Sequence, residues 1–194
     1  HSSSDSFQDC LLQDEEAELS GHRLEAKQGR HLENHLLESL FSVLVDDPVS
    51  YVNAPVLARS RGVETALVTE GDSPDHRSMV RVRMACADGS SQVVAGTVFG
   101  ARDSEKLVEI DGLDLDLPIS EHMLVFAYED KPGVVGVVGQ VLGAAGINIA
   151  NMQVCRGGGG ALLALTVDSA VDSGTVDAIR LQINAVRGAA IDLE

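Results

Sequence analysis

Residues 123–154, MLVFAYEDKPGVVGVVGQVLGAAGINIANMQV, contain the pattern that decides the fold. An apolar run at residues 123–127 predicts a strand, and Pro132-Gly133 then turns the chain into a helix. Apolar residues at three- and four-residue spacing give that helix one face to lay on a sheet: Val134, Val137, Val138, Val141, Leu142 and Ala145. Gly146 predicts the end of the helix, and residues 147–150 begin a second strand.

The residues that follow complete an ordered series of elements. A glycine turn at residues 157–160 leads into an apolar run at 161–167, which predicts a buried strand. We expect Ser173 to cap a second helix and residues 189–193 to form a last short strand. The apolar face of this second helix is expected to hold Val176, Ile179, Ile183 and Val186. The order βαββαβ predicts a ferredoxin-like sandwich, with two helices on one side of an antiparallel sheet.

The residues of the segment 123–154 argue against two other interpretations of it. The run from residue 132 to 155 has no charge, but its five glycines and four amide side chains make it too polar for a membrane span. The sequence GVVGVVG is not the GxGxxG of a dinucleotide site. Gly136, Gly139 and Gly143 lie inside the predicted helix and cost about 1 kcal/mol each against alanine. We expect close packing of the helix on the sheet to offset this cost.

Composition and charge narrow the function. The 194 residues contain 14 Lys and Arg against 30 Asp and Glu, a net charge of −16. No segment is basic, which argues against nucleic acid or an anionic membrane as a partner. The cysteines, Cys10, Cys86 and Cys155, are far apart in sequence and form no CxxC pair, so we expect free thiols in a reducing cytoplasm. The first residues lack the pattern of a signal peptide.

Upstream of residue 119 the pattern is again mixed helix and strand. Helical spacing at residues 35–45 is followed by Asn53-Ala54-Pro55, which opens a short helix that Gly62 closes. Strands are expected at residues 65–69, 79–87, 92–99 and 107–110, separated by Asp-Gly and Asp-Ser-Pro turns. The fold class is therefore α+β, in an arrangement of two domains.

The residues of these two regions resemble known families. The Lys-Pro-Gly and Ile-Asn-Ile pieces at residues 131–133 and 147–149 resemble an ACT domain, the amino-acid-sensing module of many metabolic enzymes. The pieces YVNAPVLARSRGVE (51–64), SPDHRSMVRVRM (73–84), DGSSQVVAGTVFG (88–100) and EKLVEIDG (105–112) resemble the C-terminal part of long-form D-3-phosphoglycerate dehydrogenase. The resemblance implies an intervening (allosteric substrate-binding) α+β domain at residues 36–118 and an ACT domain at 119–194. Residues 1–35 stay unassigned, although residues 17–21 fit a remnant of the first strand.

The resemblance also bears on activity. In that family the dehydrogenase activity lies in two N-terminal domains that bind the nicotinamide cofactor, and nothing in this chain resembles them. We therefore expect no catalytic residue, no NAD or other cofactor and no turnover from this chain alone. His31 and His35 stand at i,i+4 spacing, but two ligands make a weak metal site and a solvated helix face is the better interpretation.

The resemblance implies L-serine as the ligand and ACT-mediated homo-oligomerisation. In the family, serine lies between two ACT domains joined edge to edge, which here points to Tyr128, Asp130, Lys131, Pro132, Gly133 and Asn148. Asp130 suits the ammonium group, the amides after Gly133 suit the carboxylate, and Asn148 offers both a donor and an acceptor. The chain departs from many members, which carry His and Asn in place of Tyr128 and Asp130.

An anion site in the intervening domain is a further candidate. Some members bind phosphate there, and Lys106 matches one basic position. Arg81, Arg83 and Arg102 are the other basic residues that could contribute to such a site. Because the neighbours Glu105 and Glu109 are acidic, we expect weak or absent phosphate binding.

Two alternatives to a serine sensor remain. One is the ACT-containing part of an iron–sulfur L-serine dehydratase, whose cluster needs more closely grouped cysteines. The other is a structural dimerisation module with a vestigial pocket.

Overall fold

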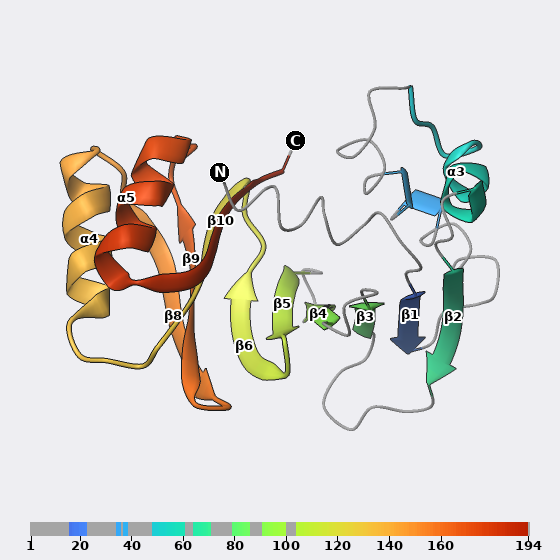
Figure 1. Ribbon diagram of the computed structural model, residues 1–194, viewed down its shortest axis with the longest axis horizontal. Coiled ribbons are helices and arrows are strands. Elements are labelled where there is room, and N and C mark those ends of the chain that lie inside the picture. The colour runs from blue at the N-terminus through green and yellow to red at the C-terminus, as the bar shows by residue number, and fades with distance from the viewer. Residues whose placement is uncertain are drawn as a thin grey trace. The chain divides into compact units, whose positions relative to one another are not determined.

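The computed structural model describes residues 16–22, 34–35, 37–38, 48–60, 64–70, 79–85, 91–99 and 104–193 (Figure 1). The chain divides into two compact units, residues 1–103 and 104–194. Each unit combines strands with helix, so the α+β fold class is confirmed. The predicted boundary between residues 118 and 119 stays a prediction.

The first unit is built on strands β1 (Glu16–His22), β2 (Glu64–Glu70), β3 (Met79–Ala85) and β4 (Ser91–Phe99), in the order β2-β1-β3-β4. Strand β1 is parallel to β2 and antiparallel to β3, with Leu19 opposite Leu67 and Val82. Strands β3 and β4 are antiparallel. Residues 17–21, which fit a remnant of a first strand in the sequence, therefore lie in an inner strand of this sheet.

Helix α3 (Ala54–Ser60) begins where Asn53-Ala54-Pro55 predicts it. The Asn53 side chain organises the turn before the helix: its Oδ1 accepts from the Ser50 amide at 2.7 Å, and its Nδ2 donates to the Pro48 carbonyl at 3.0 Å. Ala54 and Ala58 are buried against Leu37 and form a small apolar cluster.

The second unit contains the predicted βαββαβ series. Its elements are β7 (His122–Tyr128), α4 (Val134–Ala144), β8 (Ile149–Gly157), β9 (Gly160–Val167), α5 (Ser173–Ile183) and β10 (Ala185–Asp192). The sheet order is β10-β7-β9-β8 and every neighbouring pair is antiparallel, which confirms the ferredoxin-like ACT fold. Figure 1 shows both helices on one side of β8 and β9. The core between the two helices and the sheet includes Phe126, Val138, Leu142, Leu163 and Ile179.

The second helix differs from expectation at both ends. Asp172, not Ser173, caps it: the Asp172 backbone is extended, and its Oδ1 accepts from the Thr175 amide at 2.9 Å. The helix ends at Ile183 because Asn184 adopts the left-handed conformation, with φ of 54°. Val186, predicted on the helix face, therefore lies in β10 and is 76% exposed.

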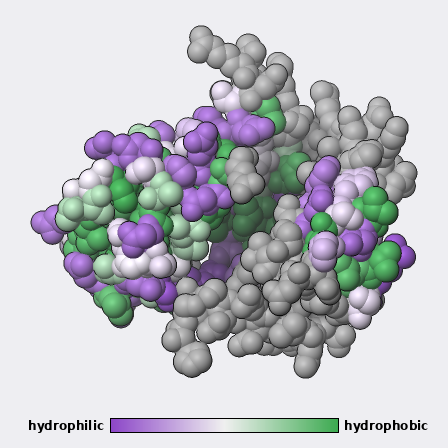
Figure 2. Space-filling model, turned by 90° about the horizontal axis from the view of Figure 1, so that it is seen from above, coloured by the Kyte–Doolittle hydropathy of each residue, from purple (hydrophilic) through white to green (hydrophobic). Residues whose placement is uncertain are grey.

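The glycines of helix α4 lie on its exposed side. Gly136, Gly139 and Gly143 are exposed, and a Cβ added at any of them would meet no atom within 4 Å. The helix packs on the sheet as expected, but these glycines take no part in that packing. Val134, Val138 and Leu142 carry that packing instead, since they share the opposite face of the helix. Figure 2 shows hydrophobic side chains interspersed with hydrophilic ones on the surface of this unit, at the left.

A hairpin that the sequence analysis predicted only in part covers the other face of the ACT sheet. Strands β5 (Ser104–Ile110) and β6 (Leu113–Pro118) are joined by Asp111-Gly112, whose φ angles of 50° and 79° suit a tight hairpin turn. Strand β6 packs on the helix-free face of β8 and β9 (Figure 1). The cluster between them consists of Ile110, Leu115, Leu117, Met123, Leu162 and Ala164.

Candidate functional site

The loop between β7 and α4 contains most of the predicted ligand residues. Tyr128 ends β7, and Asp130, Lys131, Pro132 and Gly133 follow it in an exposed loop. Gly133 is the N-cap of α4, and its φ of 94° is a left-handed conformation that glycine adopts without strain. No side chain in the described ranges hydrogen-bonds to this cap, so the first amides of α4 stay available to an anion.

A charged pair stands beside this loop. Arg156 in β8 donates from Nε to Oδ2 of Asp130 at 2.9 Å, and both side chains are substantially exposed. Burial raises the pKa of the Tyr128 hydroxyl; the Asp130 carboxylate raises it further, and Arg156 opposes both effects. Tyr128 therefore stays protonated at neutral pH and can donate a hydrogen bond. A hydroxyl, a carboxylate and a guanidinium thus converge at this end of the sheet.

Asn148 is held in a fixed orientation by Asp168. The Asn148 amide donates to Oδ1 of Asp168 at 3.0 Å, and its side-chain Nδ2 donates to Oδ2 at 2.8 Å. These two bonds, the side-chain bond first, lower the pKa of the Asp168 carboxyl. Because an ionised carboxylate only accepts, Nδ2 must face Asp168, and Asn148 presents its side-chain Oδ1 outward as an acceptor.

The structure places Asn148 at the opposite end of the sheet from Asp130. Asn148 precedes β8 and lies beside the end of β9, whereas Tyr128 pairs with the start of β9 at Ala161. The seven-residue strand β7 separates the two ends by about 20 Å, at about 3.4 Å per residue. One chain therefore brings together five of the six predicted residues, and Asn148 is not among them.

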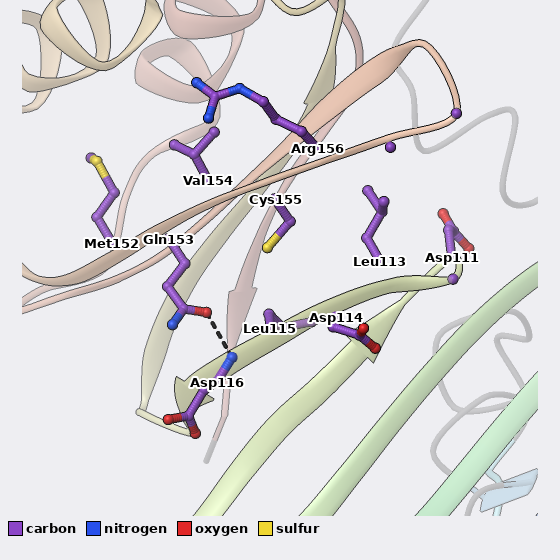
Figure 3. A pocket seen from close by; sticks show the side chains of 13 residues that line it. Asp111, Leu113, Asp114, Leu115, Asp116, Met152, Gln153, Val154, Cys155 and Arg156 are labelled. Carbon is purple, nitrogen blue, oxygen red and sulfur yellow. Dashed lines mark hydrogen bonds between the residues drawn. The ribbon is translucent and has the colours of Figure 1, made fainter.

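A groove runs between β6 and β8 on the hairpin side of the sheet. Figure 3 shows Cys155 and Gln153 pointing toward β6, while Arg156, Val154 and Met152 point toward the helices. The Gln153 side-chain oxygen accepts from the Asp116 amide at 2.7 Å and ties the hairpin to β8. Burial, with a smaller effect from Asp114, raises the pKa of the Cys155 thiol, so this thiol is a poor nucleophile.

The anion-site candidates lie in two different units. Lys106 is in β5, where its Nζ contacts Oδ1 of Asp116 at 2.7 Å, and Pro118 is opposite it in β6. Arg81 and Arg83 are in β3 of the first unit, where Arg81 is half-buried and Arg83 is exposed. The ion pair with Asp116 already compensates the charge of Lys106.

Of the remaining candidates, only His35 lies within the described residues. His35 lies beside Glu38 and Tyr51, while His31, Cys10 and Cys86 are outside the described residues. In the described ranges, no three His, Cys, Asp or Glu side chains group together as metal ligands. Within the same ranges, no helix is long and apolar enough to cross a membrane.

Sequence reasoning missed two residues of the site, Arg156 and Asp168. Arg156 follows Met152 and Val154 at two-residue spacing, so strand alternation alone could have placed it on the helix side of the sheet. Asp168 follows an apolar strand, which gives no sign that it pairs with Asn148 twenty residues earlier.

Comparisons with known proteins identify a family for each of the two regions of the chain. The profile of the D-3-phosphoglycerate dehydrogenase intervening domain matches residues 14–111, and the ACT domain profile matches residues 122–186. D-3-phosphoglycerate dehydrogenase of Mycobacterium tuberculosis (strain ATCC 25618 / H37Rv) is 38% identical over 172 residues, which cover 88% of this chain and 33% of that protein. The Mycobacterium leprae enzyme is 40% identical over 151 residues, 77% of this chain and 29% of that protein.

A more distant relative gives the same result. The Bacillus subtilis D-3-phosphoglycerate dehydrogenase is 33% identical over 135 residues, which are 69% of this chain and 25% of that protein. The chain spans about a third or less of the length of the curated relatives it matches. It belongs to the D-3-phosphoglycerate dehydrogenase family, of which it comprises the intervening domain and the ACT domain that follows it.

Proposed function

We propose that this region senses L-serine at a site shared by two ACT domains and thereby regulates a dehydrogenase of serine biosynthesis. The observation that carries the proposal is the division of the predicted ligand residues between the two ends of the ACT sheet. Tyr128, Asp130 and the start of α4 lie at one end, and Asn148 lies at the other. A second copy is therefore needed to complete the set.

Strand β8 provides a surface on which two copies can join. It is an edge strand of the four-stranded ACT sheet, and its outer side has no partner strand in the described chain. Antiparallel pairing of two β8 strands about their midpoint, Gln153, would bring Asn148 of the partner subunit to the end that holds Asp130. Such a sheet extension satisfies the unpaired backbone groups of both edges.

The chemistry of the completed site suits a small zwitterion. Asp130 supplies a charge for the ammonium group, and the amides of α4 and their dipole suit the carboxylate. The outward Oδ1 of Asn148 and the Tyr128 hydroxyl are partners for a small polar side chain. Membership of the dehydrogenase family favours this function over that of an iron–sulfur serine dehydratase.

Calorimetric titration of the chain with L-serine, glycine and L-alanine tests the ligand. Sedimentation velocity with and without serine tests the shared site. We expect saturable binding that favours serine and a dimer that serine stabilises, because mass action links ligand binding to assembly. A stable dimer that binds no amino acid would refute serine sensing and support the structural module instead.

A further inference from the structure

We propose that Arg156 binds the α-carboxylate of the amino-acid ligand, and that Arg156 and Asp130 together select zwitterions. This inference rests on the proposed function and adds to it a residue that the loop pattern does not contain. Arg156 projects from β8 toward the helix side of the sheet, as Figure 3 shows, and donates from Nε to Asp130 at 2.9 Å.

The Arg156–Asp130 ion pair leaves a donor group and an acceptor group available to a ligand. Within the described ranges, the two terminal nitrogens of Arg156 and Oδ1 of Asp130 have no hydrogen-bond partner. A guanidinium fork binds a carboxylate in a planar arrangement, and a carboxylate oxygen accepts from an ammonium group. An α-amino acid carries those two groups on one carbon, so it can dock across the pair with each charge opposite its counterpart.

Charge makes a cation necessary at this position. The chain has a net charge of −16, and at the loop itself Asp130 and Glu129 outnumber the single Lys131. A carboxylate ligand therefore meets repulsion unless a local positive group offsets it. The α4 amides provide only a partial charge, whereas Arg156 provides a full one next to Asp130.

The position of Arg156 on the edge strand connects it to the shared site. Antiparallel pairing about Gln153 places Arg156 opposite Ala150 of the partner subunit, two residues from the partner's Asn148. Arg156 then lies between Asp130 of its own chain and Asn148 of the partner. An ion pair as exposed as this one, with side chains 66% and 42% exposed, contributes little to folding, so its replacement leaves the fold intact.

The test compares L-serine with L-serine methyl ester, which keeps the ammonium and hydroxyl groups but lacks the carboxylate charge. In calorimetry on the full chain, Arg156→Gln should weaken serine binding about ten- to a hundredfold, the loss of a charge-assisted contact. The same substitution should not weaken binding of the ester, because it leaves Asp130 free for the ammonium group and removes a cation that repels the ester. Arg187→Gln is the matched control, because Arg187 also pairs with an aspartate, Asp111, but lies on β10.

Each other outcome has a distinct meaning. Unchanged serine affinity, equal losses for serine and ester, or tighter serine binding would overturn the assignment of Arg156. If the unaltered chain prefers glycine or alanine, serine as effector is refuted, and the comparison proceeds with that amino acid and its methyl ester. Absence of binding by every amino acid overturns both the proposed function and this inference.

Discussion

Replacing Leu117 with alanine should destabilise the second unit by about 3 kcal/mol. Leu117 is fully buried between the β5–β6 hairpin and the ACT sheet, in the cluster with Met123, Leu162 and Ala164. The substitution removes three carbon atoms, which at about 0.8 kcal/mol each is about 2.4 kcal/mol of lost transfer free energy. A residual cavity adds the rest, and we expect a small addition because the cluster borders the groove along β6 and can partly collapse.

Urea unfolding of the full chain measures the effect, with hydrogen exchange of the β9 amides as the readout specific to the second unit. Leu181→Ala is the control, since it makes the same chemical change at a position on α5 that is 81% exposed. Its effect should stay within about 0.5 kcal/mol. Equal effects of the two substitutions on β9 exchange would refute the packing of β6 on the ACT sheet.

Four further outcomes follow from the site and the helices. Asp130→Ala should weaken serine binding about ten- to a hundredfold in calorimetry, and unchanged affinity would exclude this loop as the ammonium site. Gly139→Ala should raise the free energy of unfolding by about 0.5–1 kcal/mol, because Gly139 is exposed in mid-helix, whereas Gly146→Ala should lower it, because Gly146 has a φ of 75°. The depressed pKa of Asp168 implies that its carboxylate stabilises the folded state above its unfolded pKa and that this stabilisation is lost as pH falls through the folded pKa. In an NMR pH titration, Asn148→Ala should return the pKa of Asp168 toward its ordinary value. Phosphate should cause no saturable NMR shifts at micromolar concentration, and shifts that vanish in Lys106→Ala would contradict this.

The ACT elements could be predicted from sequence because their signals are local. The helix that starts after Gly133 and ends shortly before Gly146 repeats its apolar residues with a helical period, and the strand at Gly160–Val167 is one continuous apolar run. The end of α5 could not be placed in the same way. Val186 continues the apolar spacing, and only the left-handed conformation of Asn184 separates helix from strand.

What the sequence analysis missed depends on contacts between distant segments. The spacing of the glycines in α4 fits a packed face of the helix as well as an exposed one. Only the tertiary contacts show that the face with Val138 and Leu142 packs on the sheet and that the glycines are exposed. Arg156 and Asp130 are 26 residues apart, and their contact requires the full register of β7, β9 and β8. Tyr128 and the four loop and cap residues of the candidate site therefore follow from a motif, whereas their charged partner does not.

The hairpin across the ACT sheet has a consequence for building chimeras from this family. Strand β5 falls within the stretch that matches the intervening-domain profile, yet it belongs to the same compact unit as the ACT sheet. A chimera with its junction between the two profiles, at residues 112–121, would take part of the β5–β6 hairpin from another enzyme. The apolar surface of Met123, Leu162 and Ala164 would then meet side chains that did not evolve to cover it. Exchange of ACT domains between relatives should therefore take Ser104–Ile110 and Leu113–Pro118 along, so that the transplanted sheet keeps its own cover.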